Sequence, residues 1–121
     1  MEIKFKKTHV DAKLPTKNYS NSLTGDAGFD LFAIESIQIP AQGSRVVPIG
    51  LKLAGITPGY WFRIEPRSGL GFKKSLQPHL GIIDNSYRGD LGIKVYNFSD
   101  TSQVVEKGTG EAQMIVYPMG L

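Results

Sequence analysis

The stretch YWFRIE at residues 60–65 indicates the fold class, because its side chains change character at every second position. Aromatic or branched apolar residues stand at positions 60, 62 and 64, and they alternate with Trp61, Arg63 and Glu65. The segments LGIKVY at 91–96 and AQMIVY at 112–117 have the same period. A period of two, rich in aromatic and β-branched residues, is typical of β-strands. We therefore predict a strand at each of these segments.

Shorter apolar runs predict further strands between and before these three. They lie at residues 3–7, 29–34, 37–40, 44–48, 51–53, 80–83 and 104–105. Gly- and Pro-containing turn sequences separate nearly all of them, and the only helical expectation is one turn after Pro66. Many short, closely spaced strands predict an all-β chain with a barrel or jelly-roll arrangement.

Length and composition limit what the chain can be. Its 121 residues suit a single domain over 1–121, and 40% hydrophobic with 21% charged residues is typical of an ordered globular protein. It has no cysteine, which excludes thiolate chemistry and fits a reducing compartment. No signal peptide or membrane-spanning run is evident, so a cytoplasmic protein is expected. The net charge of +3 does not by itself indicate nucleic-acid binding.

The strand predicted at 112–117 carries apolar side chains on both faces. One small domain has little volume with which to cover a two-faced strand. We therefore favour contacts between subunits, with a covering loop of the same chain as the alternative.

The first segment with candidate chemistry is DAGFDL at residues 26–31, where two carboxylates bracket a glycine as a strand begins. Asp30 can order water molecules around a divalent cation, because Mg²⁺ keeps much of its hydration shell. The alternative is structural, since aspartates before strands commonly hydrogen-bond the local backbone. Taken alone, the segment favours the structural interpretation.

The second segment is PRSGLG at residues 66–71. A guanidinium beside Ser and Gly backbone N–H groups suits phosphate oxygens, because the arginine donates charge-assisted hydrogen bonds and the amides form an anion nest. A plain turn with a surface arginine would have the same sequence. Both interpretations remain open on these residues alone.

The third segment is GIIDNSYRG at residues 81–89, in which an apolar strand leads into a turn with one carboxylate. Asp84 can act as a general base, and the ring of Tyr87 follows three residues later. The alternative is an Asx-turn in which Asp84 only closes a hairpin. Without further information the turn interpretation is favoured.

The three segments, in this order, resemble the trimeric dUTP pyrophosphatase (dUTPase) family. The resemblance rests on AGFDL at 27–31, PRSGL at 66–70, and GIID with YRG at 81–84 and 87–89, and it extends over about 23–118. It implies a jelly-roll-like, β-clip barrel that assembles as a homotrimer with active sites at subunit interfaces. It also implies hydrolysis of dUTP to dUMP and pyrophosphate with Mg²⁺.

The resemblance assigns roles residue by residue. Asp84 would activate the attacking water, Tyr87 would lie against the deoxyribose, and Asp30 would touch the metal through water. Backbone groups would form the hairpin that reads the edge of uracil; they belong to Gly81, Ile82, Ile83 and Gly92. Phosphates would be bound by an adjoining subunit through Arg67, Ser68 and Gly69, and Gln113 would add a hydrogen bond.

The chain departs from the family pattern in several places. In KGTGEAQM at 107–114, Gly110 and Glu111 stand where the family usually has Arg and Ile, so the contacts of that arginine cannot be carried over. Pro78 stands where many members have Asn. The family's Gly-rich C-terminal tail, with an Arg and a Phe, is not found before Leu121. Without it we expect binding with slower turnover.

Two other functions are compatible with these sequence motifs. One is a dCTP deaminase on the same fold, although Gly69 together with the 84–88 segment favours the pyrophosphatase. The other is a non-catalytic nucleotide-sensing module, which the altered fourth motif supports and the carboxylate at Asp84 argues against.

Overall fold

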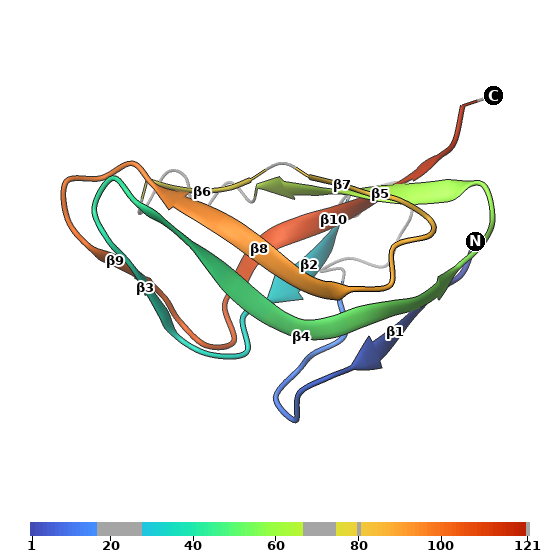
Figure 1. Ribbon diagram of the computed structural model, residues 1–121, viewed down its shortest axis with the longest axis horizontal. Coiled ribbons are helices and arrows are strands. Elements are labelled where there is room, and N and C mark those ends of the chain that lie inside the picture. The colour runs from blue at the N-terminus through green and yellow to red at the C-terminus, as the bar shows by residue number, and fades with distance from the viewer. Residues whose placement is uncertain (17–27, 67–74, 80, 121) are drawn as a thin grey trace.

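The computed structural model describes residues 1–16, 28–66, 75–79 and 81–120. Within these residues the chain forms strands and no helix (Figure 1). The strands are β1 (Ile3–Lys7), β2 (Phe29–Phe32), β3 (Ile37–Ile39), β4 (Ser44–Ile56), β5 (Tyr60–Pro66), β6 (Leu76–Pro78), β7 (Gly81–Ile83), β8 (Asp90–Asn97), β9 (Gln103–Val105) and β10 (Gly110–Pro118). The predicted all-β class is confirmed. The helical turn expected after Pro66 falls outside the described residues.

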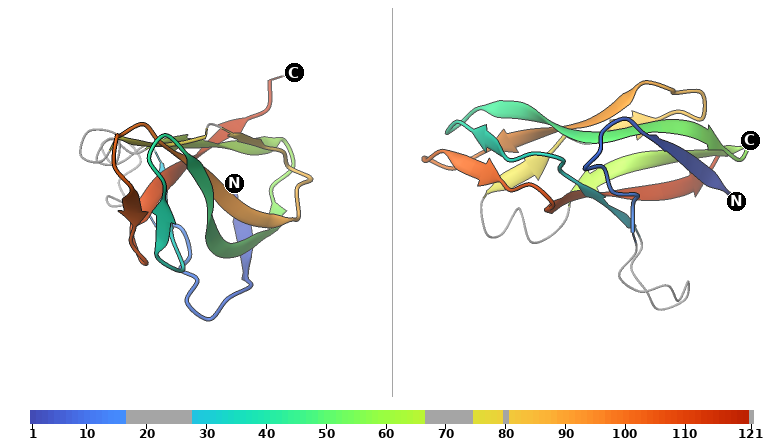
Figure 2. Two further views of the ribbon diagram at one scale, coloured as in Figure 1. Left: turned by 60° about the vertical axis from the view of Figure 1, so that its left-hand side comes forward. Right: turned by 90° about the horizontal axis from the view of Figure 1, so that it is seen from below.

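The strands form two sheets that pack face to face, as the two views of Figure 2 show. One sheet has the order β1-β4-β8-β6 and the other the order β2-β10-β5-β7. Strands β3 and β9 pair as a separate ribbon at the left-hand end of Figure 1. All described pairings are antiparallel, and this is a jelly-roll-like arrangement.

The core forms from alternate residues of both sheets. Phe62 and Ile64 on β5 are buried, and so are Leu91, Ile93 and Val95 on β8. The residues between them face outward and are partly or fully exposed. This alternation agrees with the period of two in the sequence and confirms which face of each strand is buried.

Strand β4 is longer than the sequence indicated. Pro48 and Gly50 suggested a break between two short strands, but one strand runs through both residues. Gly50 has φ of 74°, and a Cβ there would lie 3.0 Å from His9 and Ile34 side-chain atoms. The glycine therefore permits both a left-handed backbone and close packing, and the register with β8 shifts between Pro48 and Lys52.

Strand β6 was not among the predicted strands, and it ends in Pro78. The proline is tolerated because β6 is the edge strand of its sheet and, in the described part of the chain, pairs with β8 alone. An edge strand can hold a residue that lacks a backbone N–H donor.

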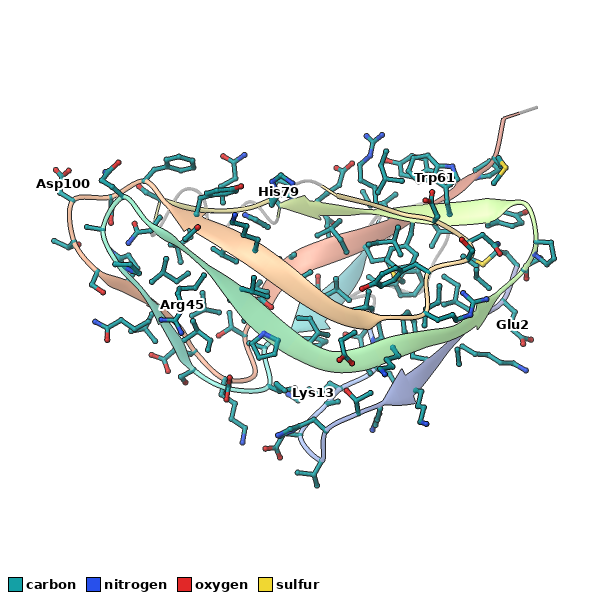
Figure 3. The ribbon with its side chains drawn as sticks, in the orientation of Figure 1. Glu2, Lys13, Arg45, Trp61, His79 and Asp100 are labelled. Carbon is teal, nitrogen blue, oxygen red and sulfur yellow. The ribbon has the colours of Figure 1, made fainter. Side chains whose placement is uncertain are left out.

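Strand β10 has a buried face with Ala112 and Met114 and a second face that is half-buried. On that second face the ring of Tyr117 stacks on Trp61 at 4.9 Å between centroids, and the Arg63 guanidinium lies 5.5 Å from the Trp61 ring. Figure 3 shows Trp61 at the upper edge of the molecule, on the same side as His79. Neighbouring side chains of the same sheet therefore cover part of the face for which subunit contacts were expected.

None of the described segments is a helix that could cross a membrane.

Candidate active site

Asp84 begins a tight turn directly after β7. The backbone N–H of Tyr87 donates to the carbonyl oxygen of Asp84 at 3.0 Å, which closes the turn. The Asp84 side chain is exposed in the single chain. The turn therefore presents a carboxylate at the surface, on a backbone that is fixed by hydrogen bonds.

The side chain of Arg88 holds the same turn from its far side. Its Nη1 donates to the carbonyl oxygens of Asn85 at 2.7 Å and Tyr87 at 2.9 Å. These bonds direct the Arg88 guanidinium to its own turn. Arg88 is therefore a structural residue of the turn.

The ring of Tyr87 folds back over Gly89. The Tyr87 hydroxyl donates to the carbonyl oxygen of Asp90 at 2.9 Å. A Cβ at residue 89 would lie 2.5 Å from that hydroxyl oxygen and 2.8 Å from Cζ of the ring. The ring occupies the space that a side chain at residue 89 would need, and its outer face remains exposed.

The two strands that flank the turn belong to different sheets. Just before β7, the His79 N–H still donates to the carbonyl oxygen of Lys94 on β8 at 2.7 Å. Beyond that point Gly81–Ile83 pairs with β5, whereas Gly92 pairs with Pro48 of β4. The expected hairpin of Gly81, Ile82, Ile83 and Gly92 is thus not a paired ladder in the described part of the chain; its two strands diverge.

The divergence leaves backbone edges available for a ligand. β7 is the outer strand of its sheet, and within the described residues no strand pairs with its other edge. Ile82 is 61% exposed, and a Cβ at Gly81 would meet nothing within 4 Å. Gly92 is different, because a Cβ there would lie 2.8 Å from Val46 Cγ1. Peptide N–H and C=O groups on this edge are suited to hydrogen-bond the donors and acceptors of a nucleobase.

Asp30 and Gln113 lie directly opposite each other on β2 and β10. Asp30 is buried, and its backbone pairs with Thr16 through an N–H···O bond of 2.7 Å. Among the residues the structure describes, no three His, Asp or Glu side chains form a cluster that could hold a metal. A single carboxylate fits a hydrated Mg²⁺ that is bound chiefly by phosphate oxygens.

Gln113 fixes the end of β5. Its Nε2 donates to the carbonyl oxygen of Pro66 at 3.0 Å. Its Oε1 occupies the space beside Gly28, where a Cβ would lie 2.6 Å away. Pro66 is the last residue before the predicted phosphate-binding residues Arg67, Ser68 and Gly69, which lie outside the described residues.

Asp84 and the start of that phosphate segment stand near opposite ends of β5. Asp84 follows Ile83, which pairs with Phe62, whereas the segment begins after Pro66. Four residues of strand separate these positions by about 13 Å. The two predicted halves of the site therefore start from separate positions along β5.

Comparisons with known proteins identify the family of the chain. The sequence model of the dUTPase family matches residues 11–120. The chain belongs to the dUTPase family. It is 39% identical over 114 residues to the deoxyuridine 5'-triphosphate nucleotidohydrolase of Oryza sativa subsp. japonica, covering 94% of this chain and 64% of that protein. The deoxyuridine 5'-triphosphate nucleotidohydrolase of Solibacter usitatus is 37% identical over 118 residues, which cover 96% of this chain and 78% of that protein.

Solved dUTPase structures have the same fold. The dUTPase of Staphylococcus bacteriophage 80alpha with dUPNHPP superposes with a TM-score of 0.88 at 24% identity, covering 99% of this chain and 84% of that one. A mutant of the dUTPase from phage phi11 of S. aureus, described for the coordination of a structural Mg(II) ion, superposes with a TM-score of 0.88 at 22% identity. The superposition covers 100% of this chain and 93% of that one. The chain spans just under two thirds of the length of the rice relative, 64%.

Glu111 is a departure from the dUTPase pattern whose consequence the sequence did not reveal. Its side chain is fully buried, at a register shift of β10 against β2, and neither carboxylate oxygen has a hydrogen-bond partner among the described residues. Burial raises the pKa of Glu111 to about 9. The group is therefore a neutral carboxylic acid at neutral pH, in a position where the family usually has isoleucine.

Proposed function

We propose that this chain is a dUTP diphosphatase that converts dUTP and water to dUMP and pyrophosphate. The observation that supports it most is Asp84, an exposed carboxylate on a hydrogen-bonded turn beside the edge of β7 that no described strand pairs with. Family membership supports the same reaction, and the relatives are named for it. Because the chain spans under two thirds of some relatives, the activity is proposed for the protein as a whole.

The proposed chemistry needs one positioned water molecule. Asp84 accepts a proton from the water, whose oxygen bonds to the α-phosphorus while the bond to the bridging oxygen breaks and pyrophosphate leaves. Such reactions depend on positioning and charge stabilisation more than on covalent catalysis. When bound, Mg²⁺ neutralises negative charge on the triphosphate, and Asp30 is the residue proposed to hold it through water.

Substrate selection is proposed to come from two features. The Tyr87 ring, lying over Gly89, would face the deoxyribose and leave no room for a 2′-hydroxyl. The backbone of Gly81, Ile82, Ile83 and Gly92 would read uracil. A tight pocket can reject the thymine methyl group by steric conflict. Gln113 would hold the phosphate segment through its bond to Pro66.

We further propose that the protein is a homotrimer and that each site combines two subunits. The separation of Asp84 from the start of the 67–69 segment along β5 supports this, because the same segment of a neighbouring subunit can supply phosphate contacts beside Asp84. Strand β10 also keeps Ile115 and Tyr117 only half-buried. A cytoplasmic location is proposed as well, and the lack of cysteine fits it.

Release of pyrophosphate from dUTP, dTTP, dCTP and UTP in the presence of Mg²⁺ tests the proposed function. We expect efficient turnover of dUTP alone and loss of that turnover when EDTA removes the metal. Ammonia release from dCTP would instead indicate a deaminase. Nucleotide binding without pyrophosphate release would indicate a sensing module.

Replacing Gly89 with alanine should weaken sugar discrimination. The new Cβ conflicts with the Tyr87 ring, which can swing outward because it is exposed. We expect the ratio of kcat/KM for dUTP to that for UTP to fall by about tenfold, a change of about 1.4 kcal/mol. Gly55→Ala is a matched control, because a Cβ at residue 55 meets nothing within 4 Å. An unchanged ratio in Gly89→Ala would separate Tyr87 from sugar selection.

A further inference from the structure

Asn85 links the catalytic turn to the start of β5 and the turn before it. Its Nδ2 group donates two hydrogen bonds, to the carbonyl oxygen of Thr57 at 3.0 Å and to that of Tyr60 at 2.9 Å. Both acceptors belong to the turn that joins β4 to β5. One half-buried side chain thus ties the residue after Asp84 to a separate part of the backbone.

The 57–60 turn is a firm point of attachment because both ends of the described chain bind to it. The backbone N–H of Thr57 donates to the Glu2 carbonyl at 2.9 Å, and the Thr57 Oγ1 accepts from the Glu2 N–H at 2.7 Å. The Met119 N–H donates to the Gly59 carbonyl at 2.6 Å. These segments meet at the right-hand end of Figure 1, where the β7–β8 connection also lies.

The Asp84 carboxylate itself makes no hydrogen bond or ion pair with any described residue. Its direction is therefore set by the backbone of its turn. Asn85 is suited to fix that backbone, because an amide NH₂ has two donors for two carbonyl oxygens. Aspartate would present only acceptors to the same carbonyls, and serine would supply a single donor.

We propose that Asn85 is a positioning residue for the reaction, which aims the Asp84 carboxylate by tying its turn to residues 57–60. This inference rests on the proposed function of Asp84. A shift of about 1 Å in a reacting group can reduce the rate by about a hundredfold. Loss of the tie therefore acts on the chemical step more than on nucleotide binding.

The test compares Asn85→Ala with Ser86→Ala, since Ser86 is an exposed neighbour in the same turn. We expect kcat for dUTP to fall at least about tenfold in Asn85→Ala, with KM within about threefold. Ser86→Ala should keep both values. An unchanged kcat, or a KM that rises in proportion to the loss of kcat/KM, would overturn the proposal.

Hydrogen exchange gives a readout that does not need activity. The Tyr87 amide, bonded to the Asp84 carbonyl, should be protected in the wild type and in Ser86→Ala and should exchange at least about tenfold faster in Asn85→Ala. Equal protection would overturn the proposal even if the protein proved inactive. A wild type without dUTP turnover contradicts the proposed function, whereas an active wild type and an equally active Asn85→Ala contradict only the role of Asn85.

Discussion

Replacing Asp84 with asparagine should lower kcat for dUTP by about a hundred- to ten-thousandfold and leave nucleotide affinity within a few-fold. The amide has nearly the same shape as the carboxylate but cannot accept the proton of the attacking water. The turn should persist, because its hydrogen bonds come from the Tyr87 backbone and the Arg88 side chain. Steady-state kinetics with calorimetric binding of a non-hydrolysable dUTP analogue separates the two effects. A variant that retained most of its rate would remove Asp84 from the mechanism.

The same variant can test whether two subunits share a site. Asp84→Asn and Arg67→Ala subunits should each be inactive alone, but random mixed trimers should recover about a quarter of wild-type activity, since one site in four combines both intact residues. Co-expression of the two variants, or mixing after reversible dissociation, provides the sample. If Asp84 and Arg67 acted within one chain, no mixture would recover activity.

Replacing Glu111 with isoleucine should stabilise the protein by at least about 3 kcal/mol at pH 8. The folded pKa of Glu111 is raised to about 9 from an ordinary 4.5, so the unfolded chain releases this proton first as pH rises. The contribution of Glu111 to the free energy of unfolding is largest below about pH 4.5. Between about pH 4.5 and pH 9 it falls by about 1.4 kcal/mol per pH unit, and above about pH 9 it levels off. Isoleucine removes that dependence and keeps a similar volume. Denaturant unfolding between pH 5 and 9, at one protein concentration, measures both effects.

Glu111→Gln is the matched control for charge. Glutamine cannot ionise, so the pH dependence should disappear, but its unpaired amide should leave the variant about 1–3 kcal/mol less stable than Glu111→Ile. A Glu111→Ile protein less stable than the wild type would contradict the expectation.

Local features of the fold and site were readable from the sequence. The alternation in 60–65, 91–96 and 112–117 predicted three strands, because a period of two depends only on neighbouring residues. Asp84 and Tyr87 share one short turn, so their proximity also followed from their spacing. The family resemblance was confirmed by the match over 11–120. It also suggested roles for residues whose function the local sequence pattern did not decide.

Other features depend on pairing between distant segments. The contact of Gln113 with Pro66 follows from the register of β10 with β5, and no local pattern indicates that register. The hydrogen bonds of Asn85 to Thr57 and Tyr60 span more than twenty residues, and an asparagine in a turn carries no signal for them. The burial of Glu111 could have been suspected only from its place among apolar residues, where isoleucine is usual. The roles of Arg67, Ser68 and Gly69 stay predictions.

The parting of β7 and β8 into different sheets bears on how this protein could change its choice of base. If uracil is recognised along the edge of β7, the recognising atoms are amides and carbonyls that every amino acid possesses. Side-chain substitutions in β7 would then leave the choice of base largely intact. Retargeting the pocket to another base would call for altering the length or path of a strand, a rarer event in evolution and a harder task in engineering.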